Sequence, residues 1–179
     1  ERILSLLEEE ALLHHYLQRG KQAGCRPISR VSEEYPRILK DKLGLDAPGC
    51  LWARGDVSVL STPAVSLVGS RELGGENLAF AREVGRQAAL QGYVLVSGNA
   101  RGADRVAQDA CLKAGGSVIS VVADELWRHE THERILYLSE DSFDAAFSAQ
   151  RAISRNRVIH CLGHWTFVAQ SGYQKGGSW

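Results

Sequence analysis

Arginine, glycine and serine gather at the ends of apolar runs in this sequence. The run over residues 65–68 ends on Gly69, Ser70 and Arg71, within the stretch VSLVGSRELGG. The run over residues 93–96 continues into residues 97–104, which read SGNARGAD. Glycine lets backbone N–H groups come close to a ligand, and arginine holds phosphate oxygens with a planar, bidentate group. These residue types in these places predict a site for phosphate groups.

A third apolar run, over residues 166–169, ends in a similar way. It leads into Gln170, Ser171 and Gly172, and then into Lys175, Gly176 and Gly177. A single end of this kind is explained equally well by a tight turn between a strand and a helix, but three ends at one sheet edge favour an anion site. The candidate residues at the three ends are Gly69, Ser70, Arg71, Ser97, Gly98, Asn99, Arg101, Gly102, Asp104, Lys175, Gly176 and Gly177.

A second basic cluster lies near residue 155, where Arg155 and Arg157 flank Asn156. The pattern places these residues at the start of a helix, where the helix dipole disfavours a positive charge. Taken alone, the pair fits a solvated surface with salt bridges. Beside an anion site, Arg155 or Arg157 would extend a positive groove.

Asp104 has two interpretations. Its carboxylate is of the type that caps the N-terminus of a helix by accepting backbone N–H groups. Its secondary interpretation is functional, because a carboxylate close to Arg71 or Arg101 would orient that side chain.

The histidines and tryptophans give weaker signals. His129 and His132 are three residues apart, and His160 and His164 are four apart, but neither pair has the H-E-x-x-H pattern of a zinc site. We therefore expect surface histidines and no bound metal. We expect the tryptophans to pack in the core or at its edge, with Trp179 as the exception because it follows the glycine pair.

The order of apolar runs indicates an α/β protein. Residues 1–19 have the spacing of a helix, residues 21–49 read as a loop, and residues 50–53 read as a short strand. From residue 64 onward, strand-like runs alternate with helical stretches, which is typical of a parallel sheet covered on both faces.

We therefore predict a doubly wound, mostly parallel, Rossmann-like sheet with a short N-terminal helical and extended segment. The expected domains are a helix and linker over 1–30 and the Rossmann-like domain over 31–179. Because the chain stops soon after a glycine pair, we expect this domain to be incomplete at its C-terminal end.

The composition sets limits on function. The chain has 179 residues with 21 basic and 21 acidic side chains, so its net charge is zero and any nucleic-acid site must be local. No apolar run approaches the length of a membrane span. Four scattered cysteines suit reduced thiols, and we expect a cytoplasmic protein.

At this point the sequence resembles a known family. The elements are Val68-Gly69-Ser70-Arg71, then S-G-x-A-R-G-x-D over residues 97–104, then Arg155-Asn156-Arg157. Each is weak alone, but in this order they are similar to the DNA-processing protein A (DprA/Smf) family, over roughly residues 31–179. There are departures, because Asn99, Ala103 and Gln108 replace the residues usual in the family.

The resemblance implies a Rossmann-like domain that binds single-stranded DNA. In the family, such proteins protect incoming DNA during natural transformation, help to load the recombinase RecA, commonly form homodimers, and need no metal or cofactor. The resemblance implies DNA-binding roles for Arg71, Ser97, Gly98, Arg101, Arg155, Asn156 and Arg157, and no catalytic residue.

Two other functions are weighed against DNA binding. A nucleotide sensor or a nucleoside-monophosphate phosphoribohydrolase would use a related fold, but such enzymes carry P-G-G-x-G-T-x-x-E. Gly176 and Gly177 are present here without the following Thr-x-x-Glu. An NAD-dependent dehydrogenase is a poor fit, since neither glycine turn has the G-x-G-x-x-G spacing.

Overall fold

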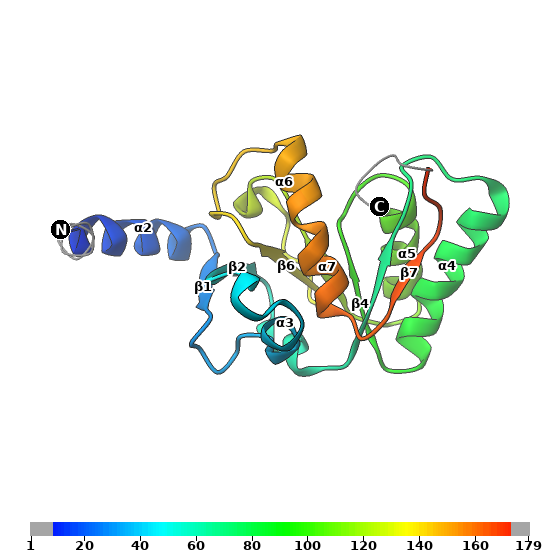
Figure 1. Ribbon diagram of the computed structural model, residues 1–179, viewed down its shortest axis with the longest axis horizontal. Coiled ribbons are helices and arrows are strands. Elements are labelled where there is room, and N and C mark those ends of the chain that lie inside the picture. Colours follow the sequence, from blue (N-terminus) through cyan, green and yellow to red (C-terminus); the bar gives the residue numbers. More distant parts are fainter. Residues whose placement is uncertain (1–8, 173–179) are drawn as a thin grey trace.

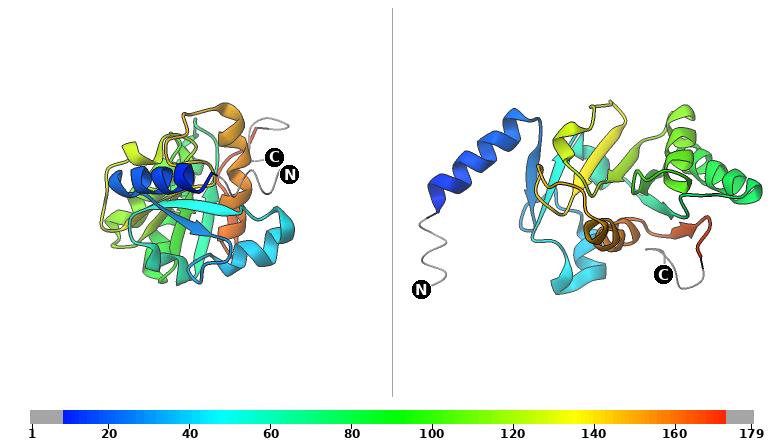
Figure 2. Two further views of the ribbon diagram at one scale, coloured as in Figure 1. Left: turned by 90° about the vertical axis from the view of Figure 1, so that its left-hand side faces the viewer. Right: turned by 90° about the horizontal axis from the view of Figure 1, so that it is seen from above.

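The computed structural model describes residues 9–172 and shows one sheet with helices on both faces (Figures 1 and 2). The described part of the sheet has seven strands in the order β1-β2-β6-β5-β4-β3-β7. The strands are β1 (Arg26–Ser29), β2 (Cys50–Arg54), β3 (Ala64–Val68), β4 (Val94–Ser97), β5 (Val118–Val121), β6 (Ile135–Ser139) and β7 (Thr166–Val168). The α-helices are α2 (Glu10–Gln22), α3 (Arg37–Leu43), α4 (Gly75–Leu90), α5 (Ala103–Lys113), α6 (Ala149–Ser154) and α7 (Asn156–Leu162).

The strand pairing confirms the doubly wound, mostly parallel sheet. Strands β7, β3, β4, β5 and β6 are parallel, whereas β2 and β1 add antiparallel pairs at one side. The chain moves from β3 towards β6 in one direction and then returns to place β7 on the other side of β3. The strand order therefore reverses between β3 and β7, and such a switch point is where open α/β sheets bind ligands.

The two faces of the sheet are buried by different helices. Helices α4 and α5 cover one face and pack on Val65, Leu67 and Leu95. Helices α3 and α7 cover the other face and pack on Val68, Val96 and other apolar residues of the strands. Because successive strand residues point to opposite faces, a strand covered on both sides must be apolar throughout. This explains the uninterrupted apolar runs.

The segment between residues 21 and 49 was wrongly predicted as a loop. It contains β1, which pairs with β2, and the short helix α3. The first helix also continues past Gly20, which was expected to end it, to Gln22. Helix α6 was not predicted, and it precedes α7 with almost no break.

Helix α2 projects from the body of the domain (Figures 1 and 2). Leu12 and Leu13 are exposed, while Tyr16 and Leu17 pack on a small third core cluster that includes Trp52. In the described residues, no helix is long and apolar enough to cross a membrane.

Candidate functional site

Two adjoining cavities lie along the carboxyl ends of the parallel strands, with volumes of about 300 and 690 Å³. We call them together the strand-end groove. The smaller cavity is lined mainly from the ends of β4 and β5, and the larger runs past the β3 end to the residues after β7. Both are bordered by Arg71, Ala100, Arg101, Ala152 and Arg155. The structure thus brings together the strand ends that the sequence indicated.

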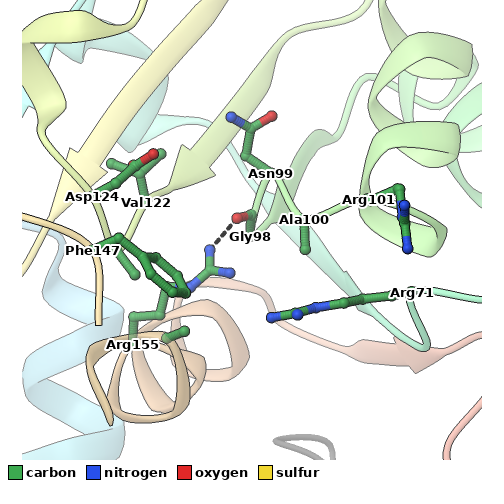
Figure 3. A pocket seen from close by; sticks show the side chains of 11 residues that line it. Arg71, Gly98, Asn99, Ala100, Arg101, Val122, Asp124, Phe147 and Arg155 are labelled. Atoms are coloured by element: carbon green, nitrogen blue, oxygen red, sulfur yellow. Dashed lines mark hydrogen bonds between the residues drawn. The ribbon is translucent and has the colours of Figure 1, made fainter. Parts of the chain in front are cut away.

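Arg71 and Arg101 are the basic groups available in this groove. Both side chains are exposed. Within residues 9–172, neither guanidinium has a hydrogen-bond or ion-pair partner among those observed. Figure 3 shows Arg71 reaching across the cavity towards Arg155. An exposed guanidinium that forms no ion pair keeps its capacity for an anionic ligand.

The loop after β4 has a special backbone conformation. Asn99 has a φ of 59°, the single positive φ outside glycine in the described residues, and Gly102 has a φ of 91°. A Cβ atom on Gly102 would lie 2.5 Å from the carbonyl oxygens of Ser70 and Arg71, so these two loops touch through backbone atoms. The amide of Ala103 donates to Ser70 O at 3.1 Å. The loops after β3 and β4 therefore form one rigid wall of the groove.

Asp104 stabilises the loop after β4 through hydrogen bonds to its backbone. Its Oδ2 atom accepts the backbone amides of Gly98 (3.0 Å) and Ala100 (3.2 Å), and the residue is 5% exposed. Burial raises the pKa of Asp104 to about 6, against the opposing effects of Arg155, the two amides and Arg71. The capping interpretation is wrong, because Gly102 is the N-cap of α5 and Asp104 bonds amides of the preceding loop instead. The orienting interpretation stays a prediction, since Asp104 lies in the electrostatic field of Arg155 and Arg71 without a side-chain bond to either among the described residues.

The raised pKa of Asp104 has a consequence for stability. The folded state binds a proton on Asp104 more tightly than the unfolded chain does, so protonation of Asp104 stabilises the fold. This contribution to the free energy of unfolding is fully present below the ordinary pKa of 3.8 and is lost as the pH rises through about 6. We expect Asp104→Asn to keep both amide bonds and to be more stable than the wild type at about pH 8. The gain in urea unfolding free energy should shrink as the pH falls towards about 4. A gain in unfolding free energy that does not change with pH would contradict the raised pKa of Asp104.

Arg155 is the buried arginine of the groove. It is 8% exposed, and its Nη1 atom donates to the carbonyl oxygens of Gly98 and Val121, at the ends of β4 and β5. Figure 3 shows the bond to Gly98. Within residues 9–172, Arg155 Nε has no partner, and neither has Asn99 Oδ1. Burial lowers the pKa of Arg155, while Asp104 and Asp124 oppose this effect. Arg155 therefore links two strand ends, and its buried Nε–H group has no partner within the described residues.

The structure separates some of the other predicted residues from the groove. Arg157 lines neither cavity of the groove and donates to Glu140 Oε2 (2.6 Å) and Asp46 O (2.5 Å). Ser97 is fully buried, and its Oγ atom accepts from Gln108 at 2.5 Å. Asn156 lines the larger cavity. Of the two arginines that could extend the groove, Arg155 therefore lines it and Arg157 does not.

Gly69 and Ser70 lie where the sequence placed them, at the switch point. Both line the larger cavity, and the amide of Ser70 donates to Gln170 O at 2.8 Å, which joins the loops after β3 and β7. The predicted residues Lys175, Gly176 and Gly177, together with Trp179, lie outside the described residues.

Phe147 is a residue of the groove that sequence reasoning missed. It lies in the loop before α6, is 59% exposed, and lines the smaller cavity together with Arg71 and Arg155 (Figure 3). An exposed phenylalanine beside guanidinium groups offers a flat apolar surface next to positive charge. No local pattern in the sequence indicates it, because the surrounding loop has no periodicity.

The fold and the groove define a class of protein, namely a Rossmann-like domain with an arginine-lined groove at the switch point of its sheet. The family is also clear. The sequence model of the family DNA recombination-mediator protein A matches residues 26–179, and the chain belongs to this family. The resemblance seen in the sequence is thereby confirmed.

Individual relatives agree with this assignment. The chain is 30% identical over 178 residues to DNA processing protein DprA of Bacillus subtilis, which covers 93% of this chain and 59% of the relative. It is 36% identical over 159 residues to DprA of Streptococcus pneumoniae, covering 83% of this chain and 55% of the relative. The chain therefore spans less than two thirds of the length of these curated relatives.

Solved structures show the same fold. The X-ray structure of Streptococcus pneumoniae DprA matches with a TM-score of 0.79 and 27% identity, over 94% of this chain and 60% of that one. The Helicobacter pylori protein matches with a TM-score of 0.69 and 24% identity, over 86% of this chain and 72% of that one. The Helicobacter pylori structure was described for its single-stranded DNA binding mode.

Proposed function

We propose that this chain binds single-stranded DNA in the strand-end groove. The observation that carries the proposal is the combination of two exposed arginines, Arg71 and Arg101, with the exposed ring of Phe147 in one groove. Proteins that bind single strands without sequence preference combine a basic groove for the backbone with aromatic rings for the bases. Membership of the DprA family and the single-strand binding described for the Helicobacter pylori protein support the proposal.

The finer parts of the proposal follow from the family. We propose that the binding module is the Rossmann-like domain over 31–179, and that it acts in the cytoplasm on DNA taken up during natural transformation. In this role it would hand the strand to RecA and work as a homodimer. We assign it no catalytic step and no cofactor.

A salt-dependent binding comparison tests the proposal. Fluorescence anisotropy would measure the affinity of the same sample for a single strand, for a duplex of the same sequence, and for a mononucleotide in competition. We expect the single strand to bind best, with an affinity that falls steeply with salt and varies little with sequence. A mononucleotide that competes as well as the oligonucleotide at equal concentration would favour a nucleotide sensor instead.

Phe147→Ala tests the aromatic part of the groove. Stacking of one base is worth roughly 1–3 kcal/mol, so we expect a loss of about 5- to 150-fold in single-strand affinity and little change in salt dependence. The matched control is Trp165→Ala, another exposed aromatic residue, which lies before β7 and outside the groove. An equal loss for both variants would show that the effect is not local.

A further inference from the structure

The loop that carries Phe147 is a long connection between β6 and α6, over residues 140–148. Ser148 ends it as the N-cap of α6, because its Oγ accepts the amide of Arg151 at 3.1 Å. Arg151 in turn donates to Ala146 O. These contacts fix the side of the loop nearest to α6, and Phe147 lies within that short span.

The other side of the loop is held by the N-terminal helix. The Tyr16 hydroxyl on α2 donates to Asp144 Oδ1 at 2.7 Å, and Arg19 lies 3.3 Å from Asp144 Oδ2. The hydrogen bond from Tyr16 lowers the pKa of Asp144, as expected for a carboxylate that accepts a bond in its ionised form. Helix α2, which is more than one hundred positions away in the sequence, therefore contacts the loop three residues before Phe147.

The ring of Phe143 adds an apolar anchor beside this bond. Phe143 is 3% exposed, and its ring centroid lies 5.0 Å from that of Tyr16 and 4.9 Å from that of Trp52. Tyr16 thus contacts the loop twice, through its ring and through its hydroxyl. Ring pairs at these distances contribute beyond the area that they bury.

Helix α2 contacts strand β1, Trp52 on β2 and the loop after β6 through its C-terminal half. The N-terminal half of the helix projects outward, with Leu12 and Leu13 exposed, and the loop after β6 passes the other end of the helix (Figures 1 and 2). The contacts that reach the loop over residues 140–148 are those of Tyr16 and Arg19 with Asp144 and Phe143.

We propose that α2 is a positioning element of the nucleic-acid site, which acts through the Tyr16–Asp144 contact to set the loop over 140–148 and so the placement of Phe147. The inference rests on the proposed function, because it assigns to Phe147 a contact with a base. Tyr16 and Asp144 are positioning residues, since neither lines the groove.

A double-mutant cycle in the whole chain tests this inference. Tyr16→Phe keeps the ring packing and removes the hydroxyl, and Asp144→Ala removes the acceptor; each is combined with Phe147→Ala. We expect each single change to weaken binding of a labelled oligothymidylate roughly three- to tenfold, in line with one hydrogen bond. In the Phe147→Ala background we expect no further weakening, since the ring that Tyr16 and Asp144 position is gone.

The control is Ser58→Ala, which removes a hydroxyl bonded to Asp56 Oδ2 at 2.7 Å, outside both the loop over 140–148 and the groove. Its affinity should match the wild type even if its stability falls. If Tyr16 has a purely structural role, Tyr16→Phe should weaken binding by the same factor with and without Phe147. That outcome would overturn the inference. Unchanged binding by both Tyr16→Phe and Asp144→Ala would overturn it too.

The failure of the inference and the failure of the proposed function are distinguishable. If the wild type binds a single strand and Phe147→Ala weakens binding, while Tyr16→Phe and Asp144→Ala do not, the positioning role is wrong and the function stands. If Phe147→Ala has no effect while Arg71→Ala does, the positioning role is also wrong. A wild type that binds no single strand overturns both.

Discussion

Arg71→Ala is expected to weaken single-strand binding roughly 10- to 100-fold, because hydrogen bonds to a charged group contribute about 1.5–3 kcal/mol each. Arg71 lines both cavities of the groove and is exposed at the switch point of the sheet. Its guanidinium makes no observed bond within residues 9–172, so its removal should leave the melting temperature unchanged. The slope of log affinity against log salt should become shallower by about 0.7 for each phosphate that the variant no longer neutralises.

Arg82→Ala is the matched control for this prediction. Arg82 is an exposed arginine on α4, outside the groove, so its substitution removes the same charge from the chain. Anisotropy titrations at two or more salt concentrations should show near wild-type binding for Arg82→Ala. Equal affinities of wild type and Arg71→Ala would show that the groove is not the binding site.

The strand ends could be predicted from the sequence because they obey a general rule. Once the apolar runs of β3 and β4 are recognised, the residues that follow must lie at one edge of a parallel sheet. Gly69, Arg71 and Arg101 were placed in this way, and the structure has them together. The prediction needed only the order of the strands and not their contacts.

The roles of Arg155 and Arg157 could not be separated from the sequence. Two residues apart on a helix are about 200° apart around its axis, so one of the pair faces the domain while the other faces solvent. Which one is buried depends on how α7 sits against the sheet, and this is set by tertiary packing of Val158, Ile159 and Leu162. Phe147 was missed for the same reason, since its place depends on a loop without periodicity.

The strand β1 escaped prediction because it is a short edge strand. It has four residues, including Pro27, and proline is depleted in strands except at edges. Its existence depends on pairing with β2, from which it is separated by α3 and the turn after it. A local pattern therefore carries no sign of it.

Arg155→Ala is expected to lower the free energy of unfolding by about 3 kcal/mol, the cost typical of leaving a buried charge and buried carbonyls without partners. The carbonyl oxygens of Gly98 and Val121 would lose their donor, and buried Asp104 would lose the positive charge nearest to its carboxylate. Urea unfolding followed by circular dichroism measures the loss. Arg37→Ala, which breaks a solvent-exposed ion pair of 3.7 Å, is the control and should change stability by less than about 0.5 kcal/mol.

Two further measurements separate the charge of Arg155 from its geometry. Arg155→Lys keeps the positive charge near Asp104 but lacks the fork of N–H groups, so we expect an intermediate loss. The cost of Arg155→Ala should also be smaller at about pH 5 than at about pH 8, because protonated Asp104 needs no counter-charge. A loss for Arg155→Ala that is the same at both pH values would assign the whole effect to the two carbonyl bonds. A wild-type stability for Arg155→Ala would show that the bonds of Arg155 to the two strand ends do not stabilise the fold.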